Sequence, residues 1–593
     1  MTVSRRAFVA RLGGSVLTSA LLAACTQPPA SPPTSAPAAG TTAPAAQPTT
    51  PPAAAGATSA PKPTTAPAQA APAATQAAVV SRTGRLQLPT YMAPKSVPPD
   101  VAGTKIVPGG YLQYPKQLVK SVPETPARGG EITITTQTLT VSPVPMDQNR
   151  YWQESNKRVG AKLNFSITPF ADYGAKVATI MAGSELPDIM YLPQGQPVPG
   201  FPQFLESRAA DLTPHLSGDA VKDYPNLAAH PTSVWKSTII NNKIFGVGTP
   251  LAPFFWVHWM HQELLEQIGS KPPSSAADFK RIMQALTKPQ EGVYGLVAEA
   301  GYQYGYGTVN QLLTSIYGGP NQWSLTNGKL TRLFETDQFK AAVSFARELW
   351  DGGLYEPGAA GYNTLSARTA FIARKGMFRW DGNTPDHFIA RGAPQGQQPP
   401  PKIRLVPPFG AESGVTPSYP LYHGNFGTAV LKKAPEDRIK ELLRVINWMA
   451  APFGTEEYHF RAYGLEGVHF DFNERGSPVI NETQRAEVLP WNGITNPAPV
   501  YFDPNGTTEY VPHVVETFKL YEAVGKEDPT VGFYSESNGR VGVVANQRFG
   551  DGINDIITGR RPSSDLASLI QQWKADGGDM VRKEYEEAMA AAG

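Results

Sequence analysis

An Ala/Pro/Thr tract near the start of the chain separates a part that can fold from a part that cannot. Residues 26–80 hold 13 of the 58 prolines, one charged residue (Lys62) and no aromatic residue. Such a composition buries too little apolar surface to offset the entropy lost on ordering, so we expect the tract to form no core. The roughly 465 residues from Gly129 onward hold most of the aromatic and charged residues, and they are enough for two domains of ordinary size.

The residues before the tract have the pattern of an export signal. Arg5 and Arg6 precede a short apolar run that ends at Cys25 in the sequence Leu-Ala-Ala-Cys. Twin arginines before a short apolar segment are typical of twin-arginine export, and Leu-Ala-Ala-Cys resembles the lipobox of bacterial lipoproteins. We predict that residues 1–24 are a removed signal peptide, that Cys25 is lipidated, and that residues 25–80 tether the folded body to the outer face of the cell membrane.

Charge, cysteine content and hydropathy exclude several classes of protein and of site. The formal net charge is +2, and it becomes −1 once the three arginines of the signal are removed, so a nucleic-acid-binding protein is not expected. Cys25 is the single cysteine, which excludes a disulfide framework and a multi-cysteine zinc site. No run of 18 apolar residues follows Cys25, so we expect no membrane-spanning helix in the mature chain.

The folded body alternates between strand and helix patterns, which indicates α/β layers. Residues 131–136 and 162–167 alternate polar and apolar side chains, as strands do. Apolar residues at helical spacing follow three helix-start signals, Ser275, Thr336 and Pro435.

Motifs of catalysis and metal binding are missing or incomplete. No Gly-x-Ser-x-Gly elbow, His-Glu-x-x-His helix or Walker loop occurs. His258 and His261 lack a third ligand nearby, so we expect neither a metal nor a cofactor. Residues 471–476 have part of a calcium-loop spacing, but Arg475 stands where an oxygen ligand is expected, which favours a hairpin turn. A glycosidase stays an open alternative, because the separation of paired carboxylates is a three-dimensional property.

Aromatic residues are concentrated in the folded body. They include the run 254–256, three alternating tyrosines from Tyr302 to Tyr306, and isolated tryptophans such as Trp380 and Trp491. A flat ring packs on the apolar face of a pyranose while nearby polar groups bind its hydroxyls, as in small-molecule pockets generally. The pattern suggests a sugar site without identifying one.

Several motifs in a fixed order resemble those of one known family. Residues 181–189 resemble the Ala-Ser-Gly-Asp-x-Pro-Asp-Ile segment of the carbohydrate-type extracellular solute-binding proteins (family 1) that serve bacterial ABC importers. Residues 242–247 resemble the family's Gly-Lys-Ile-Tyr-Gly-Val hairpin, with Asn242 in place of glycine. Residues 463–470 resemble the Gly-x-Glu-Gly-x-His-Tyr segment of its larger lipoproteins. The resemblance covers about residues 129–590 in order.

The resemblance implies an α/β, two-lobed, periplasmic-binding-protein-like fold, with a ligand cleft between lobes that crossing strands join. We expect the chain to cross between the lobes near Pro250, near Pro407 and near Gly464. The predicted segments are an irregular proline-rich strap at 81–128, an N-terminal lobe at 129–250 and 410–464, and a C-terminal lobe at 251–409 and 465–593.

The resemblance also implies the function and the ligand site. We predict a lipid-anchored monomer without catalytic residues that captures a sugar or oligosaccharide and delivers it to the ABC permease in the membrane. The alternatives are an importer protein for a peptide or opine and, third, a surface glycosidase. The residues carried over as ligand-binding are Tyr191, Gln194, Phe255, Trp256, Glu299, Tyr302, Trp380, Asp381, Glu466, His469 and Trp491.

Overall fold

The computed structural model describes residues 86–138, 142–193, 200–298, 312–362, 364–382, 401–503 and 509–592. The predicted signal, Cys25 and the tether lie outside the described residues, as do the site candidates Gln194, Glu299 and Tyr302. None of the described helices combines the length and the hydropathy needed to cross a membrane.

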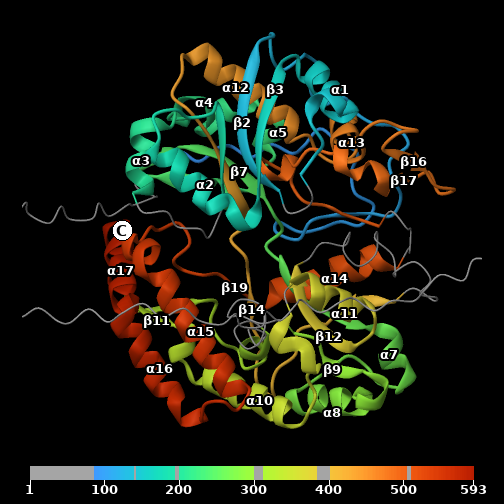
Figure 1. Ribbon diagram of the computed structural model, residues 1–593, viewed down its shortest axis with the longest axis vertical. Helices are drawn as coiled ribbons and strands as arrows, with labels where there is room; N and C mark the ends of the chain where they lie inside the picture. Colours follow the sequence, from blue (N-terminus) through green and yellow to red (C-terminus); the bar gives the residue numbers. More distant parts are fainter. Residues whose placement is uncertain are drawn as a thin grey trace, which may run out of the picture. The chain divides into compact units, whose positions relative to one another are not determined.

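The first lobe is built on a mixed five-stranded sheet (Figure 1). Three strands near the start of the chain run parallel, and a strand from much later in the chain inserts antiparallel between two of the others. The strand order is β3 (Lys162–Pro169), β2 (Glu131–Thr138), β4 (Ile189–Pro193), β15 (Asn425–Leu431) and β7 (Gly246–Pro250).

Helices cover both faces of this sheet. Successive residues of a strand point to opposite sides of the sheet, so each face has its own side chains to bury. Helices α1 (Arg150–Val159) and α12 (Glu436–Met449) pack into one core with Ile132 and Leu163. Helices α2 (Phe170–Ala182) and α3 (Phe201–Arg208) pack into a second core with Met190. We call this second core the α2 cluster.

Local sequence signals explain where these helices begin and end. The Asn149 side chain accepts a hydrogen bond from the Trp152 N–H at 2.8 Å, which caps the start of α1. Gly160 ends α1 in the left-handed conformation at φ 79°, which favours glycine. Pro435 directly precedes α12, as its sequence signal predicts.

The second lobe is built on a four-stranded sheet with its own core. Helices α8 (Ala276–Leu286) and α10 (Asp337–Asp351) begin at the predicted caps, where Ser275 accepts from the Asp278 N–H and Thr336 accepts from the Phe339 N–H. Further helices of this lobe are α14 (Tyr510–Ala523), α15 (Val543–Ile557), α16 (Leu566–Trp573) and α17 (Asp579–Ala592). The strand order is β13 (Ile403–Leu405), β8 (Trp256–His261), β12 (Gly376–Gly382) and β9 (Tyr294–Leu296).

The chain passes from the first sheet to the second between Pro250 and Trp256, close to the predicted position. The second crossing differs from its prediction at Pro407. The prolines after β13 end that strand without leaving the lobe, because Phe409 packs in the second-lobe core, 5.9 Å from the ring of Phe279. The chain returns only after β14 (Tyr419–Pro420), so the second crossing segment is residues 421–424.

The third crossing also differs from its prediction at Gly464. The chain stays on the first lobe because Trp491 and Ile494 are buried in the core that covers its sheet. The Thr495 hydroxyl then donates to the Gly248 carbonyl at 3.0 Å, and Tyr501 lies in a second-lobe core. By packing, residues 410–420 therefore lie with the second lobe and residues 465–494 with the first.

The predicted strap is described from Leu86 onward, and it contacts both lobes. The Met92 N–H donates to the Ala228 carbonyl of the first lobe at 2.9 Å. Further along, Val107 is buried among second-lobe residues, and β1 (Gly110–Tyr111) pairs with β18 (Tyr501–Phe502). The strap thus runs beside the crossing segments as an additional link between the lobes.

Candidate functional site

Five aromatic side chains gather where the first two crossing segments leave the lobes. We call them the hinge aromatic group; its members are Phe255, Trp256, Trp380, Tyr422 and Phe426. The Phe255 ring lies 4.7 Å from Trp256, 5.4 Å from Tyr422 and 6.5 Å from Phe426, measured between ring centroids. The structure therefore brings together three of the predicted site residues and adds two that the sequence analysis did not identify.

Strand pairing in the second lobe sets the position of the two tryptophans. In the β8–β12 ladder, Gly382 lies opposite Trp256 and Trp380 lies opposite His258. The Trp256 and Trp380 rings stack at 4.5 Å with an interplanar angle of 17°. Trp380 is only 3% exposed, whereas Trp256 is half-buried. Trp380 thus supports the ring of Trp256 from behind.

Backbone hydrogen bonds hold the two crossing segments together. The Leu251 N–H donates to the Gly424 carbonyl at 2.9 Å, and the Tyr422 N–H donates to the Pro253 carbonyl at 2.7 Å. Gly424 has φ 77°, so the turn between Tyr422 and Asn425 requires a left-handed residue. This turn places the half-buried Tyr422 ring beside Phe255.

The buried side chain of Asn425 fixes the point at which the second crossing segment enters the first sheet. Its Oδ1 accepts from the Thr249 N–H at 2.8 Å, and its Nδ2 donates to the Ser237 hydroxyl at 2.6 Å. Because Thr249 lies in β7, this bond ties the start of β15 to the strand that leads into the first crossing.

Asp381 lies next to Trp380 in β12 and is buried. Its carboxylate accepts two hydrogen bonds of 2.7 Å from Arg368, one of 2.9 Å from Arg379 and one of 2.6 Å from the Gly382 N–H. Burial acts to raise the pKa of Asp381, but the Arg368 hydrogen bonds and the charges of both guanidiniums hold that pKa below its ordinary value. These contacts, and an exposure of only 1%, make Asp381 a buried structural carboxylate rather than a group open to a ligand.

Tyr191 is the middle residue of β4 and has no exposed surface. A Cβ at residue 427 would lie 2.2 Å from the Tyr191 hydroxyl oxygen, so only glycine at Gly427 accommodates the ring. Burial first, and then the proximity of Tyr422, raise the pKa of Tyr191 well above its ordinary value. Tyr191 therefore packs on the first-lobe side of the hinge aromatic group, beneath its surface.

Glu466, His469 and Trp491 lie away from the hinge aromatic group. Trp491 is in the first-lobe core and donates from Nε1 to the Tyr151 hydroxyl. His469 is 1% exposed and 3.3 Å from Glu487, and Glu466 is exposed. The prediction that these three residues belong to the site depends on a last crossing that precedes them. The chain crosses between the lobes after these residues, so their position no longer supports assigning them to the site.

The segment with a partial calcium-loop spacing forms a hairpin, as the sequence favoured. Strands β16 (Phe470–Phe472) and β17 (Pro478–Ile480) pair antiparallel. Between them, Asn473 Oδ1 accepts from the Arg475 and Ser477 N–H groups, both at 3.0 Å. The asparagine oxygen therefore closes a turn.

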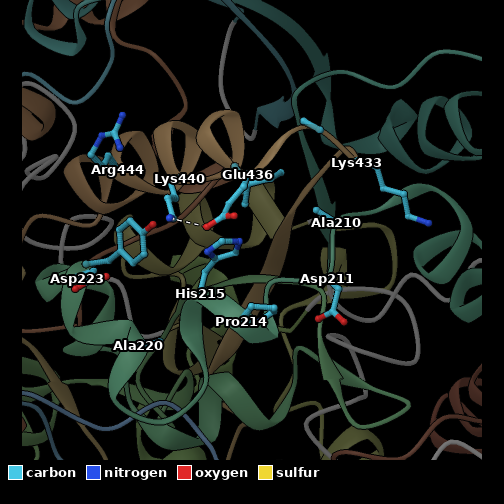
Figure 2. Close-up of a pocket in the computed structure, with 13 residues that line it drawn as sticks. Ala210, Asp211, Pro214, His215, Ala220, Asp223, Lys433, Glu436, Lys440 and Arg444 are labelled. Carbon is cyan, nitrogen blue, oxygen red and sulfur yellow. Dashed lines mark ion pairs between the residues drawn. The ribbon is translucent and has the colours of Figure 1, made fainter.

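A cavity of about 740 Å³ opens on the first lobe between α4 (Thr213–Leu216) and α12 (Figure 2). Several of its charged side chains already have partners. Glu436 pairs with Lys440 at 2.6 Å, and Asp211 accepts from the Thr213 N–H at 3.0 Å. None of the predicted ligand residues lines this cavity. The hinge aromatic group is therefore the better candidate for a ligand site.

Two curated proteins of Bacillus subtilis (strain 168) are similar to the chain. Lipoprotein LipO is 20% identical over 472 residues, which are 77% of this chain and 92% of LipO. The polygalacturonan/rhamnogalacturonan-binding protein YtcQ is 21% identical over 459 residues, 75% of this chain and 89% of YtcQ. No family model matches the chain.

A solved structure of an HMO-binding, ABC-transporter-associated solute-binding protein from Bifidobacterium longum infantis has a similar fold. The TM-score is 0.56 at 10% identity, over 78% of this chain and 98% of that one. The two-lobed α/β architecture is therefore that of the solute-binding proteins, as the motifs predict. The resemblance of this chain to the carbohydrate-type solute-binding proteins of ABC importers is confirmed, and the chain has their fold.

Proposed function

We propose that this protein is the substrate-binding component of an ABC importer and that it captures a sugar or oligosaccharide between its two lobes. The observation that carries the proposal is the hinge aromatic group, which joins side chains of both lobes at their crossing segments. The similarity to YtcQ, named as a polygalacturonan/rhamnogalacturonan-binding protein, supports a carbohydrate ligand.

The chemistry of the hinge aromatic group suits a pyranose ring. Trp256 and Tyr422 are half-buried, so each keeps ring surface for a ligand while its other side is packed. An aromatic ring offers a large, rigid contact area to the apolar face of a sugar. Trp256 begins β8 of the second lobe, Tyr422 lies in the second crossing segment, and Phe426 lies in β15 of the first lobe. A ligand that contacts these rings together therefore stabilises a closed arrangement of the lobes.

Export and anchoring belong to the same proposal. The twin arginines and the Leu-Ala-Ala-Cys sequence support secretion followed by lipidation at Cys25, and the similarity to Lipoprotein LipO agrees with a lipoprotein. The proline-rich tract would then leave the binding protein free to move above the membrane while staying near its permease. Delivery to a permease requires no catalytic residue, and we propose a monomer without enzymatic activity.

A thermal-shift screen against a glycan panel tests this proposal. The panel contains oligogalacturonides, rhamnogalacturonan fragments, neutral oligosaccharides and, as non-sugar controls, short peptides. A ligand at a hundredfold excess over its Kd adds about 2.7 kcal/mol to the free energy of unfolding, which gives a measurable rise in Tm. We expect at least one glycan to raise the Tm and no peptide to do so.

Analysis of the same samples for products separates binding from catalysis. We expect every glycan to be recovered intact after incubation. Cleavage of the glycan that binds would contradict the proposed function and favour the glycosidase. A shift with peptides alone would favour a non-sugar importer protein.

A further inference from the structure

The chain segment that carries Tyr534 is part of the second lobe, whereas the Tyr534 ring packs against the first lobe. It lies between β19 (Gly525–Lys526) and α15, in a segment that leads into second-lobe helices. Its ring, however, packs against the α2 cluster, the first-lobe core that contains Tyr173 and Val177 of α2. Tyr534 therefore forms a contact between the lobes that does not belong to the crossing segments.

A carboxylate on α17 fixes the segment that carries Tyr534. Glu584 accepts hydrogen bonds from the Ser535 hydroxyl at 2.6 Å, the Ser537 N–H at 2.9 Å and the Ser537 hydroxyl at 2.6 Å. Both serines are buried, and Val581 of the same helix packs in the second-lobe core. The segment is thus attached to the second lobe at two positions that directly follow Tyr534.

The Tyr534 hydroxyl is also held in place. It donates to a Glu536 carboxylate oxygen at 2.7 Å. A tyrosine is neutral near pH 7, and burial and then this carboxylate raise the pKa of Tyr534 further above its ordinary value. A neutral, oriented ring can pack on the apolar α2 cluster without desolvating a charge.

We propose that Tyr534 is the closing contact of the two lobes, a positioning residue that slows ligand release by stabilising the closed arrangement. Phe426 of the hinge aromatic group packs on the same α2 cluster, so the closing contact and the candidate site share one first-lobe surface. Rotation about the crossing segments that opens the lobes separates the Tyr534 ring from that surface. The part of the proposal that concerns ligand release rests on the proposed function; the contact between the lobes does not.

Fluorescence energy transfer tests the lobe contact without any ligand. The full-length chain carries Cys25→Ser, which removes its single native cysteine, and Lys176→Cys and Val544→Cys for the two dyes. Lys176 is exposed on α2 of the first lobe, and Val544 is 59% exposed on α15 of the second. We expect Tyr534→Ala to shift the open-to-closed ratio about three- to tenfold toward open, as loss of one aromatic contact implies. Tyr534→Phe keeps the ring and serves as the matched control.

A stopped-flow measurement tests ligand release, with the glycan identified by the thermal-shift panel as the probe. Tyr534→Ala is expected to raise koff by the same factor and to leave kon nearly unchanged, while Tyr534→Phe stays near the parent. Glu584→Gln, which weakens the attachment of the segment, is expected to change both readouts in the same direction. A change in Tm alone, with no change in energy transfer, would mark Tyr534 as merely structural.

Energy transfer in Tyr534→Ala equal to that of the parent would overturn the proposal. Because that experiment contains no ligand, its failure leaves the proposed function standing. Conversely, failure of the whole glycan panel would refute the proposed function without deciding whether Tyr534 holds the lobes closed.

Discussion

Trp256→Ala is expected to weaken carbohydrate binding by about 2–4 kcal/mol, or roughly thirtyfold to a thousandfold in Kd, the range of a binding hot spot. The reason is the position of the ring: it stacks on the buried Trp380 at 4.5 Å, touches Phe255, and is half-buried at the crossing between the lobes. Because the Trp256 ring is already held in place by Trp380, it loses little conformational entropy when a sugar packs on it. Isothermal titration calorimetry measures the change.

Trp350→Ala provides the matched control for Trp256→Ala. Trp350 lies in the last turn of α10 and packs at the edge of the second-lobe core, and no member of the hinge aromatic group contacts it in the described structure. Both variants lose one indole ring, but only Trp256→Ala is expected to lose affinity. Equal affinity for the ligand in Trp256→Ala and in the parent would remove the hinge aromatic group from the site.

Acidification is expected to destabilise the protein well above the pH at which carboxylates titrate. Burial lowers the pKa of His230 and of His258 to about 3 each, from an ordinary value of 6.5. Below pH 6.5 the unfolded chain binds protons at both positions and the folded protein does not. Stability is therefore full above pH 6.5 and falls as the pH drops from 6.5 toward 3.

The size of this pH effect follows from the linkage relation. Each histidine contributes about 1.4 kcal/mol per pH unit in that window, so the two together remove on the order of 5 kcal/mol by pH 4.5. Thermal unfolding followed by circular dichroism from pH 7.5 to 4.5 measures the loss. The double variant His230→Gln, His258→Gln is expected to have a shallower decline in Tm over the same range. An unchanged decline in that variant would show that other groups cause it.

Local sequence signals were sufficient to locate several helices of both lobes. The starts of α8, α10 and α12 were predicted from Ser275, Thr336 and Pro435, because a cap and the apolar spacing after it act within a few residues. The crossing points depend on which sheet a distant strand joins. The pairing of β15 with β4 and β7 is a long-range contact, and no local sequence pattern predicts it.

The prediction of the candidate site was limited in the same way, by contacts between residues far apart in the sequence. Phe255, Trp256 and Trp380 were found through motifs that lie close to them in sequence. Tyr422 and Phe426 were missed because the second crossing was placed at Pro407, although the turn at Gly424 next to aromatic residues was a usable signal.

The misassignment of Trp491 has a different cause. A tryptophan looks the same in sequence whether it packs in a core or lines a ligand site, and only the contact between Trp491 and Tyr151 in the first-lobe core distinguishes the two. The same ambiguity applies to His469, whose contact with Glu487 is a core contact.

A crystal structure of the complex with the glycan selected by the thermal-shift panel tests the central claim most directly. The account predicts electron density for the sugar between the two lobes, with a ring face against Trp256 and further contacts to Phe255 and Tyr422. Density for the glycan in the first-lobe cavity beside His215 (Figure 2), with the hinge aromatic group free of ligand, would contradict it.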